Sequence, residues 1–245
     1  MSGLQRFMDV LYLFSVEDDA WTIQTMANAL SVPQSTVYRT VRDLVKASLL
    51  EPALESHYRL GAAFVEFDRK IRLTDPLIRV GQPVLRDIIE QAHVPCVGLL
   101  SRLYDKTVMC VADETNSARH LQSSYERGRP MPLTRGATSK VILAQLPTRR
   151  LTKILEIHAD DDLSAKDFRE MLLEIRKRGY SVTRGEIDHG LIGIAAPVSS
   201  HSLGLVASLS LVVQAKEVDP AAERRLVMLL MSAGKLLTET LLHSI

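Results

Sequence analysis

Residues 22–46 contain two short helical patterns separated only by the tripeptide "SVP", residues 31–33. Thr22 is suited to cap the first of these helices, whose apolar positions recur at helical spacing as far as Leu30. Pro33 stands at the start of the second, where proline is favoured. A connection this short forces the two helices to pack across each other. An apolar run over residues 4–14 has the same period and predicts one more helix before them.

The segment "LLEPALESHYRLG", residues 49–61, follows these helices and has the pattern of two short strands around a polar bend. Helix, helix, tight turn, helix and a two-stranded wing are typical of a winged helix-turn-helix. We therefore predict such a DNA-binding domain over residues 1–61.

The helix that begins beside Pro33 has two different faces. Val37, Val41 and Leu44 form an apolar stripe that must face the core. This turns a polar set outward, namely Gln34, Ser35, Thr36, Tyr38, Arg39 and Arg42, and Arg59 lies on the wing. Amides and hydroxyls at a helix N-terminus suit a phosphate, and an arginine fork can pair with guanine or clamp the DNA backbone. The alternative is that this is an ordinary solvated helix face. Because the predicted winged helix-turn-helix would present the same face to DNA, the pattern favours DNA binding.

The charge balance limits what one copy can do. The chain has a net charge of +1, and residues 21–61 hold four basic against three acidic side chains. Because affinity for the phosphate backbone grows with the number of cations, a single copy should bind DNA weakly. We expect two-fold dimers on a partly palindromic operator.

The second part of the chain changes its period. Residues 62–75 read as a helical linker, and residues 76–245 as a further domain in which Pro83 should kink or interrupt a helix. Strand patterns "VPCVGLLSRL" and "KTVMCVA" come first and are followed by three helical stretches, the last of which should begin at a Ser164 cap and end at Gly179. Further strand patterns are "YSVTRG", "LIGIAAPV" and "LGLVASLSLVV", and a closing helix covers residues 219–245. This order predicts an α+β fold around an antiparallel sheet.

Composition excludes some classes of protein. With 46% hydrophobic and 24% charged residues, the chain can bury a core and is not disordered. Cys96 and Cys110 have neither zinc nor redox spacing and read as buried thiols. The apolar run near the N-terminus is too short for a membrane span and lacks a cleavage site. We expect a cytoplasmic protein without membrane contact.

Three segments resemble the IclR family of bacterial transcription regulators. "LSVPQSTVYRTVRDLVKASLLE" with "SHYRLG" is similar to the family's DNA-binding half, and "PMPLTRGATSKVILAQLP" to its effector loop. "RGYSVTRGEIDHGLIGIAAPVSSHSLGLVASLSLV" resembles its C-terminal signature, with Glu186, Gly190, Ala195, Ala196 and Pro197 in the expected order. The resemblance spans nearly the whole chain, and three motifs in the right order make it specific.

The resemblance implies a GAF-like antiparallel-sheet domain that binds a small organic acid or aromatic catabolite, and dimers that pair into tetramers on DNA. Effector contacts would come from Gly136, Ala137, Thr138, Thr183, Gly193 and Ser210. An amide-rich loop that opens a helix suits a carboxylate independently of the family.

The chain departs from the family pattern at several of these positions. Thr183 and Gly193 stand where some members carry an acidic residue and a cysteine, and Val212 replaces a second serine. The pocket should therefore be less polar and suit a bulkier or aromatic ligand. Arg135 beside the loop either pairs with an acidic ligand or is an ordinary exposed arginine.

Other constellations are weaker. Glu186, Asp188 and His189, or His158 with its neighbouring aspartates, lack the spacing of a metal site, so we expect no metal and no cofactor. No serine lies in a nucleophile elbow. Two alternatives stay open: a small-molecule-converting enzyme whose winged segment is an interaction module, and a winged scaffold without sequence preference.

Overall fold

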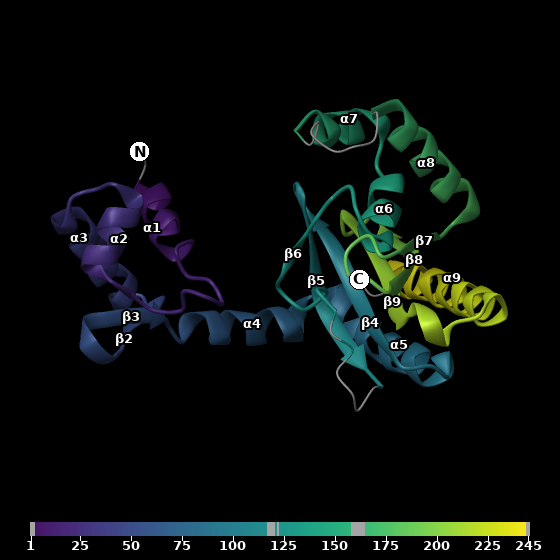
Figure 1. The fold of residues 1–245 in the computed structure, drawn as a ribbon, viewed down its shortest axis with the longest axis horizontal. Helices are drawn as coiled ribbons and strands as arrows, with labels where there is room; N and C mark the ends of the chain where they lie inside the picture. The colour runs from purple at the N-terminus through teal and green to yellow at the C-terminus, as the bar shows by residue number, and fades with distance from the viewer. Residues whose placement is uncertain (1–2, 117–120, 122, 158–164, 244–245) are drawn as a thin grey trace. The chain divides into compact units, whose positions relative to one another are not determined.

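The computed structural model describes residues 3–116, 121, 123–157 and 165–243 (Figure 1). The chain divides into two compact units between Thr74 and Asp75. The elements of the N-terminal unit are α1 (Gly3–Leu11), β1 (Trp21–Thr22), α2 (Ile23–Leu30), α3 (Gln34–Lys46), β2 (Leu50–Pro52), the 3-10 turn η1 (Leu54–Ser56), β3 (His57–Leu60) and α4 (Ala63–Thr74).

The predicted Thr22 cap and the predicted short turn between the two helices are confirmed. The Thr22 hydroxyl accepts the Thr25 N–H at 3.2 Å, and the Thr25 hydroxyl in turn accepts the Thr22 N–H at 3.0 Å. Helix α2 ends at Leu30, and the next residue, Ser31, has a left-handed φ of 54°. Pro33 immediately precedes the first residue of α3, so only residues 31–33 connect the two helices. The chain reverses within this connection, and α2 packs on α3. The buried core of this unit is Val10, Met26, Ala27, Val37, Val41, Leu44 and Leu50.

The wing has one strand more than predicted. Its sheet has the order β1-β3-β2, in which Trp21 and Thr22 pair antiparallel with Tyr58 and His57. A strand of two residues is too short to show alternating apolar and polar residues in the sequence, so it is recognised only from its pairing in the folded structure. The unit is a winged helix-turn-helix as expected.

The C-terminal unit is built around one antiparallel sheet of order β6-β5-β4-β9-β8-β7. Helices α5 and α9 pack on one face of the sheet, and α6 packs on the other with α8 beside it (Figure 1). The elements are α5 (Pro76–Ala92), β4 (Cys96–Tyr104), β5 (Thr107–Thr115), β6 (Pro130–Met131), α6 (Ala137–Ala144), α7 (Thr148–Ile157), α8 (Ala165–Arg178), β7 (Ser181–Arg184), β8 (Leu191–Ser200), β9 (Leu205–Gln214), the 3-10 turn η2 (Ala215–Glu217) and α9 (Pro220–Leu242).

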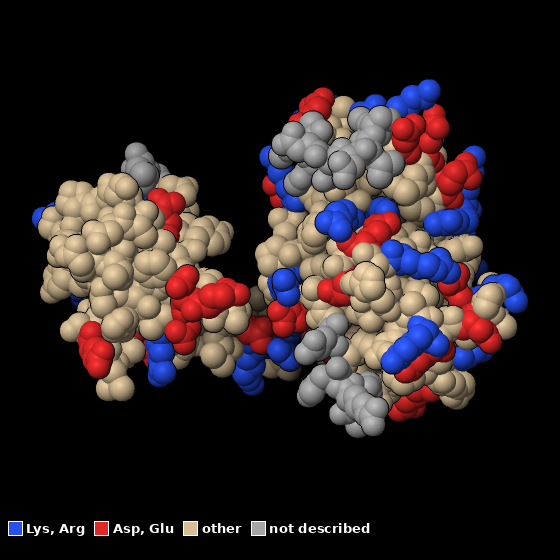
Figure 2. All heavy atoms as spheres, viewed as in Figure 1, with Lys and Arg blue, Asp and Glu red and all other residues tan. Residues whose placement is uncertain are grey.

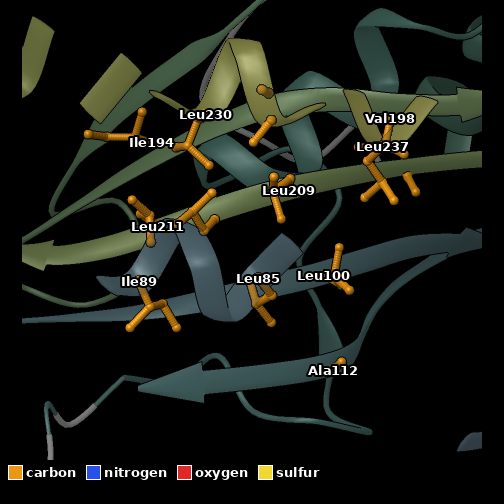
Figure 3. Packing of buried hydrophobic residues seen from close by; sticks show 14 of the residues in the cluster. Leu85, Ile89, Leu100, Ala112, Ile194, Val198, Leu209, Leu211, Leu230 and Leu237 are labelled. Atoms are coloured by element: carbon orange, nitrogen blue, oxygen red, sulfur yellow. The ribbon is translucent and has the colours of Figure 1, made fainter. Parts of the chain in front are cut away.

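Alternation along β9 explains why the sheet has two different faces. Leu209 and Leu211 point to the α5 and α9 side, where they meet Leu230 and Leu237 of α9 (Figure 3). Ser208 and Ser210 alternate with these leucines and are also fully buried, on the side that faces α6. Along β9 the sheet therefore has an apolar face toward α5 and α9 and a face with buried hydroxyls toward α6.

Several details differ from the sequence prediction. Helix α5 runs unbroken through Pro83, because its apolar side is held tightly against the sheet: a Cβ at Gly81 would lie 2.7 Å from Leu100 Cδ1. Strand β6 is again only two residues long and was not predicted. Gly179 ends α8 as expected, with a φ of 76°, whereas the predicted cap Ser164 lies outside the described residues.

The described residues also bear on the predictions for the two cysteines and for a membrane span. Cys96 and Cys110 are both free and buried, as predicted. No helix within the described ranges combines the length and apolarity that crossing a lipid bilayer requires.

Candidate nucleic-acid interface and effector site

The outer face of α3 carries the side chains that the sequence proposed for DNA. The exposed residues are Gln34, Ser35, Tyr38, Arg39 and Arg42, and Tyr38 keeps 55% of its residue surface accessible. Thr36 differs from the rest because it is half-buried, and its carbonyl accepts the buried Thr40 hydroxyl at 3.1 Å. The apolar stripe of Val37, Val41 and Leu44 is what turns this polar set outward.

Two of the predicted cations already have carboxylate partners. Arg42 contacts Asp43 at 3.1 Å, and Arg59 contacts Glu51 at 2.6 Å across the β2–β3 ladder. Arg39 makes no ion pair with any of the residues that the structure describes. In Figure 2 the N-terminal unit, on the left, shows mostly uncharged atoms and few basic ones. With Arg42 and Arg59 engaged by carboxylates, two of the three arginines predicted to contact DNA carry charge that is already partly compensated.

The proposed effector residues come together where α6 begins. Gly136, with a φ of 83°, precedes the helix. The Ala137 N–H donates to the Thr183 hydroxyl at 3.1 Å, and the Thr138 hydroxyl donates to Ser210 Oγ at 3.1 Å. Gly193 lies in the same place, since a Cβ there would be 3.5 Å from the Cβ of Ala137. We call this arrangement of Gly136, Ala137, Thr138, Thr183, Gly193 and Ser210 the cradle.

A buried ion pair that the sequence did not predict closes the cradle on one side. Lys140 Nζ lies 2.6 and 2.7 Å from the two carboxylate oxygens of Glu186, and the Gly136 N–H donates to the same carboxylate at 2.8 Å. Only 7% of the Lys140 side chain is accessible, against 32% of Glu186. Arg135 is exposed and donates to the Glu186 carbonyl. It therefore braces the loop from outside.

Tyr125 is the second residue that sequence reasoning missed. Its ring is buried, and a Cβ at Gly136 would lie 2.2 Å from the phenolic oxygen, so only glycine fits beside it. Burial raises the pKa of Tyr125 to about 12, against the opposing effect of its hydrogen bond with Thr138. The phenol therefore stays protonated at neutral pH and can donate. No motif marks Tyr125, because its role depends on a long-range contact.

The free space in the cradle is small. The cavity lined by Tyr125, Thr183, Gly193 and Val212, together with the loop at residues 185–188, measures about 20 Å³. Small-molecule sites are usually about 300 to 1,000 Å³. In the described arrangement this cavity is therefore too small for an organic ligand.

The residues that resembled metal ligands have other partners. Glu186 is engaged by Lys140, and Asp188 accepts the Ser124 N–H at 2.8 Å. Within the described ranges no three His, Cys, Asp or Glu side chains gather as a metal site would require. His158 and the aspartates after it lie outside those ranges.

A winged helix-turn-helix followed by an α+β unit with an antiparallel sheet defines a class of two-domain DNA-binding regulators. The IclR helix-turn-helix domain matches residues 3–53, and the IclR C-terminal domain of bacterial transcriptional regulators matches residues 74–238. The chain belongs to the IclR family. It is a DNA-binding transcription regulator.

Individual relatives are distant but cover most of the chain. The regulator KipR of Bacillus subtilis is 24% identical over 84% of this chain and 83% of its own, and the Pca regulon regulatory protein of Pseudomonas putida is 23% identical over 96% and 82%. An IclR homologue from Microbacterium hydrocarbonoxydans, solved with 4-hydroxybenzoate, is 20% identical and covers both chains fully with a TM-score of 0.80. The crystal structure of the Thermotoga maritima IclR is 17% identical in sequence and covers 98% of each chain with a TM-score of 0.73.

Proposed function

We propose that the protein is a ligand-responsive regulator that binds a partly palindromic operator as a dimer and senses a small organic acid or aromatic compound. The proposal assigns DNA binding to residues 1–61, linkage to residues 62–75 and sensing to residues 76–245. The observation that carries it is the exposed polar face of α3, which is the second helix of the helix-turn-helix and is free to enter a major groove.

Within that face, Arg39 is the strongest candidate for base or phosphate contact. Arg42 and Arg59 must share their charge with Asp43 and Glu51, whereas Arg39 has no such partner among the described residues. Gln34 is tied to Gln24 of α2, which suits a positioning role at the helix N-terminus. Few free cations mean few released counterions, so one unit binds weakly and a dimer is required.

Helix α4 supports the dimer. Its residues Phe64, Phe67 and Ile71 recur at helical spacing and are 38%, 51% and 46% exposed. An apolar stripe on a helix of a folded unit is stabilised by a partner, and a second copy would place two α3 helices on one duplex. Two such dimers would form the tetramer that the family resemblance implies.

Phe67→Glu should shift the protein toward monomer in analytical ultracentrifugation, whereas Leu173→Glu on exposed α8 should not.

The DNA proposal is tested by fluorescence anisotropy with the intergenic DNA beside the protein's own gene. Arg39→Ala should cost about 1 to 3 kcal/mol, and Arg42→Ala less, because Asp43 already engages its charge. Arg224→Ala on exposed α9 is the control and should leave binding unchanged. Binding by Arg39→Ala at the wild-type level would remove α3 as the recognition helix. Absence of a footprint at any one site would favour a scaffold without sequence preference.

The sensing proposal rests on the cradle. Amides at the start of α6 and the hydroxyls of Thr183 and Ser210 suit a carboxylate or phenol. A ligand alters DNA affinity only through its different affinity for two arrangements of the protein, typically about 1 to 3 kcal/mol. A closed cradle with this small cavity and a cradle opened to admit a ligand would be two such arrangements. The relative solved with 4-hydroxybenzoate makes that compound the first to try.

Two neighbouring serines provide a matched test. Ser210 and Ser208 lie on the same face of β9 and are both buried, but Ser210 bonds Thr138, while Ser208 Oγ has no partner among the described residues. Ser210→Ala should weaken 4-hydroxybenzoate binding in calorimetry by about tenfold, and Ser208→Ala should leave it within about twofold. Equal effects of both changes would place the ligand elsewhere.

A further inference from the structure

A second, larger cavity lies at the other end of α6. It measures about 470 Å³, within the range of small-molecule sites. The C-terminal half of α6, the start of α7, the end of α8 and the β8–β9 turn form its walls. It shares no lining residue with the cradle, whose free space is about 20 Å³. The two are therefore separate sites of the same domain.

The walls of this cavity combine an apolar surface with positive charge. Val141 and Leu146 line it from α6 and its end, and Ile175 lines it from α8. Arg150, Arg176 and His201 come from three different segments, and the described lining contains no aspartate or glutamate. Arg150 and Arg176 are both exposed at this cavity, and their like charge makes the local potential positive, which attracts an anion. The combination suits a ligand with one negative charge and an apolar body.

Two polar side chains of the wall, Gln145 and Arg150, have hydrogen-bond partners within the protein. Arg150 Nη2 donates to the Asp105 carbonyl at 3.3 Å, and this single bond leaves most of its guanidinium donors for a ligand. Gln145 Nε2 donates to the carbonyls of Val141 and Ala207 at 3.2 and 2.9 Å, which fixes the end of α6 to β9. The end of α6 is therefore a fixed part of the wall and does not have to be ordered when a ligand binds.

We propose that this cavity is a second small-molecule site, which binds an organic monocarboxylate through Arg150 and Arg176 and packs the ligand's apolar part against α6 and α8. The site goes beyond the cradle and does not depend on the ligand of the cradle. A carboxylate held by two arginines forms charge-assisted hydrogen bonds, which are the stronger kind.

Calorimetry on the full chain with benzoate, phenylacetate and octanoate tests the proposal in a Gly193→Val background. A Cβ at Gly193 already lies 3.4 Å from Thr183 Oγ1, so valine fills the cradle and leaves the larger cavity free. The double variant Arg150→Glu/Arg176→Glu reverses the charge of the cavity. Arg149→Glu/Lys177→Glu makes the same change of net charge at exposed neighbouring positions outside it. Circular dichroism shows whether each variant is folded.

We expect at least one of the three acids to bind, and the double variant of the cavity to lose at least about tenfold in affinity while the control stays within about twofold. Ser199→Trp, which places an indole in the cavity wall, should abolish binding. Benzyl alcohol, 2-phenylethanol and 1-octanol should bind at least about tenfold more weakly than the acids. Equal loss in the control, equal binding of the alcohols, or no binding of any acid at about 10 mM overturns the proposal.

Discussion

The Lys140–Glu186 pair makes the sharpest prediction about the stability of the C-terminal unit. Its partners are buried unequally: 7% of the Lys140 side chain is accessible and 32% of the Glu186 side chain. Removing one member of a buried pair leaves the other charge uncompensated, and the cost depends on how much water can reach the charge that stays. Glu186→Gln should therefore destabilise the protein more than Lys140→Met.

The magnitudes follow from this asymmetry. Glu186→Gln leaves an ammonium with almost no access to water, which places the loss near the lower end of the usual range for buried pairs, about 3 kcal/mol. Lys140→Met leaves a carboxylate that is one-third exposed and still accepts the Gly136 N–H, so its loss should be about 1 to 2 kcal/mol. The double variant Lys140→Met/Glu186→Gln leaves no unpaired charge. The coupling energy between the two substitutions should therefore be about 1.5 to 3 kcal/mol.

Urea unfolding followed by circular dichroism at 222 nm measures all three losses. Lys235→Met/Glu239→Gln on α9 is the control, because this pair is 3.9 Å apart and largely exposed, and it should change the free energy of unfolding by less than about 0.5 kcal/mol. If Lys140→Met cost as much as Glu186→Gln, or if the double variant cost the sum of the two, the argument from unequal burial would be wrong.

Three further predictions concern stability. Thr22→Ala removes the hydroxyl that caps α2 and should lower the free energy of unfolding by about 1 kcal/mol in urea titrations, whereas Thr22→Ser should retain most of it. Gly61→Ala should prevent stable folding of the wing, seen as lost thermal cooperativity, because its Cβ would lie 2.3 Å from the Ser48 carbonyl oxygen. Burial raises the pKa of Cys96 to about 11 and that of Cys110 to about 12. The folded state thus keeps protons that the unfolded chain loses above about pH 9, so stability should fall as pH rises beyond that value, by up to about 1.4 kcal/mol per unit for each thiol. Cys110→Ala should make this decline shallower in unfolding measured at pH 8 and 10.5, and an unchanged slope would contradict the assignment.

The sequence alone was enough for features that depend on near neighbours. The 3.6-residue spacing of Val37, Val41 and Leu44 predicted both the buried stripe of α3 and the exposed side that Arg39 shares. Thr22 and Gly179 marked helix ends through chemistry that acts within a few residues. Strands β4, β5, β7, β8 and β9 were long enough to show their period, while β1 and β6, each of two residues, were not.

The cradle shows where local reasoning stops. The family resemblance indicated Gly136, Thr183 and Ser210, but neither the volume of their pocket nor the role of Tyr125 could be read from the chain. The sequence around Glu186 did not indicate an ion pair, and only the structure shows that Lys140, 46 residues earlier, contacts its carboxylate. The second cavity likewise depends on Arg150, Arg176 and His201, which belong to separate segments.

Sequence determined the helices, the longer strands and the outward side of α3, because periodicity and capping act over a few residues and leave a readable pattern. Tertiary structure alone decided which charges are paired, how much room the cradle keeps and where the larger cavity lies. These properties arise when the sheet brings together residues that are distant in the chain, and neither burial nor an ion pair across such a distance has a local signature.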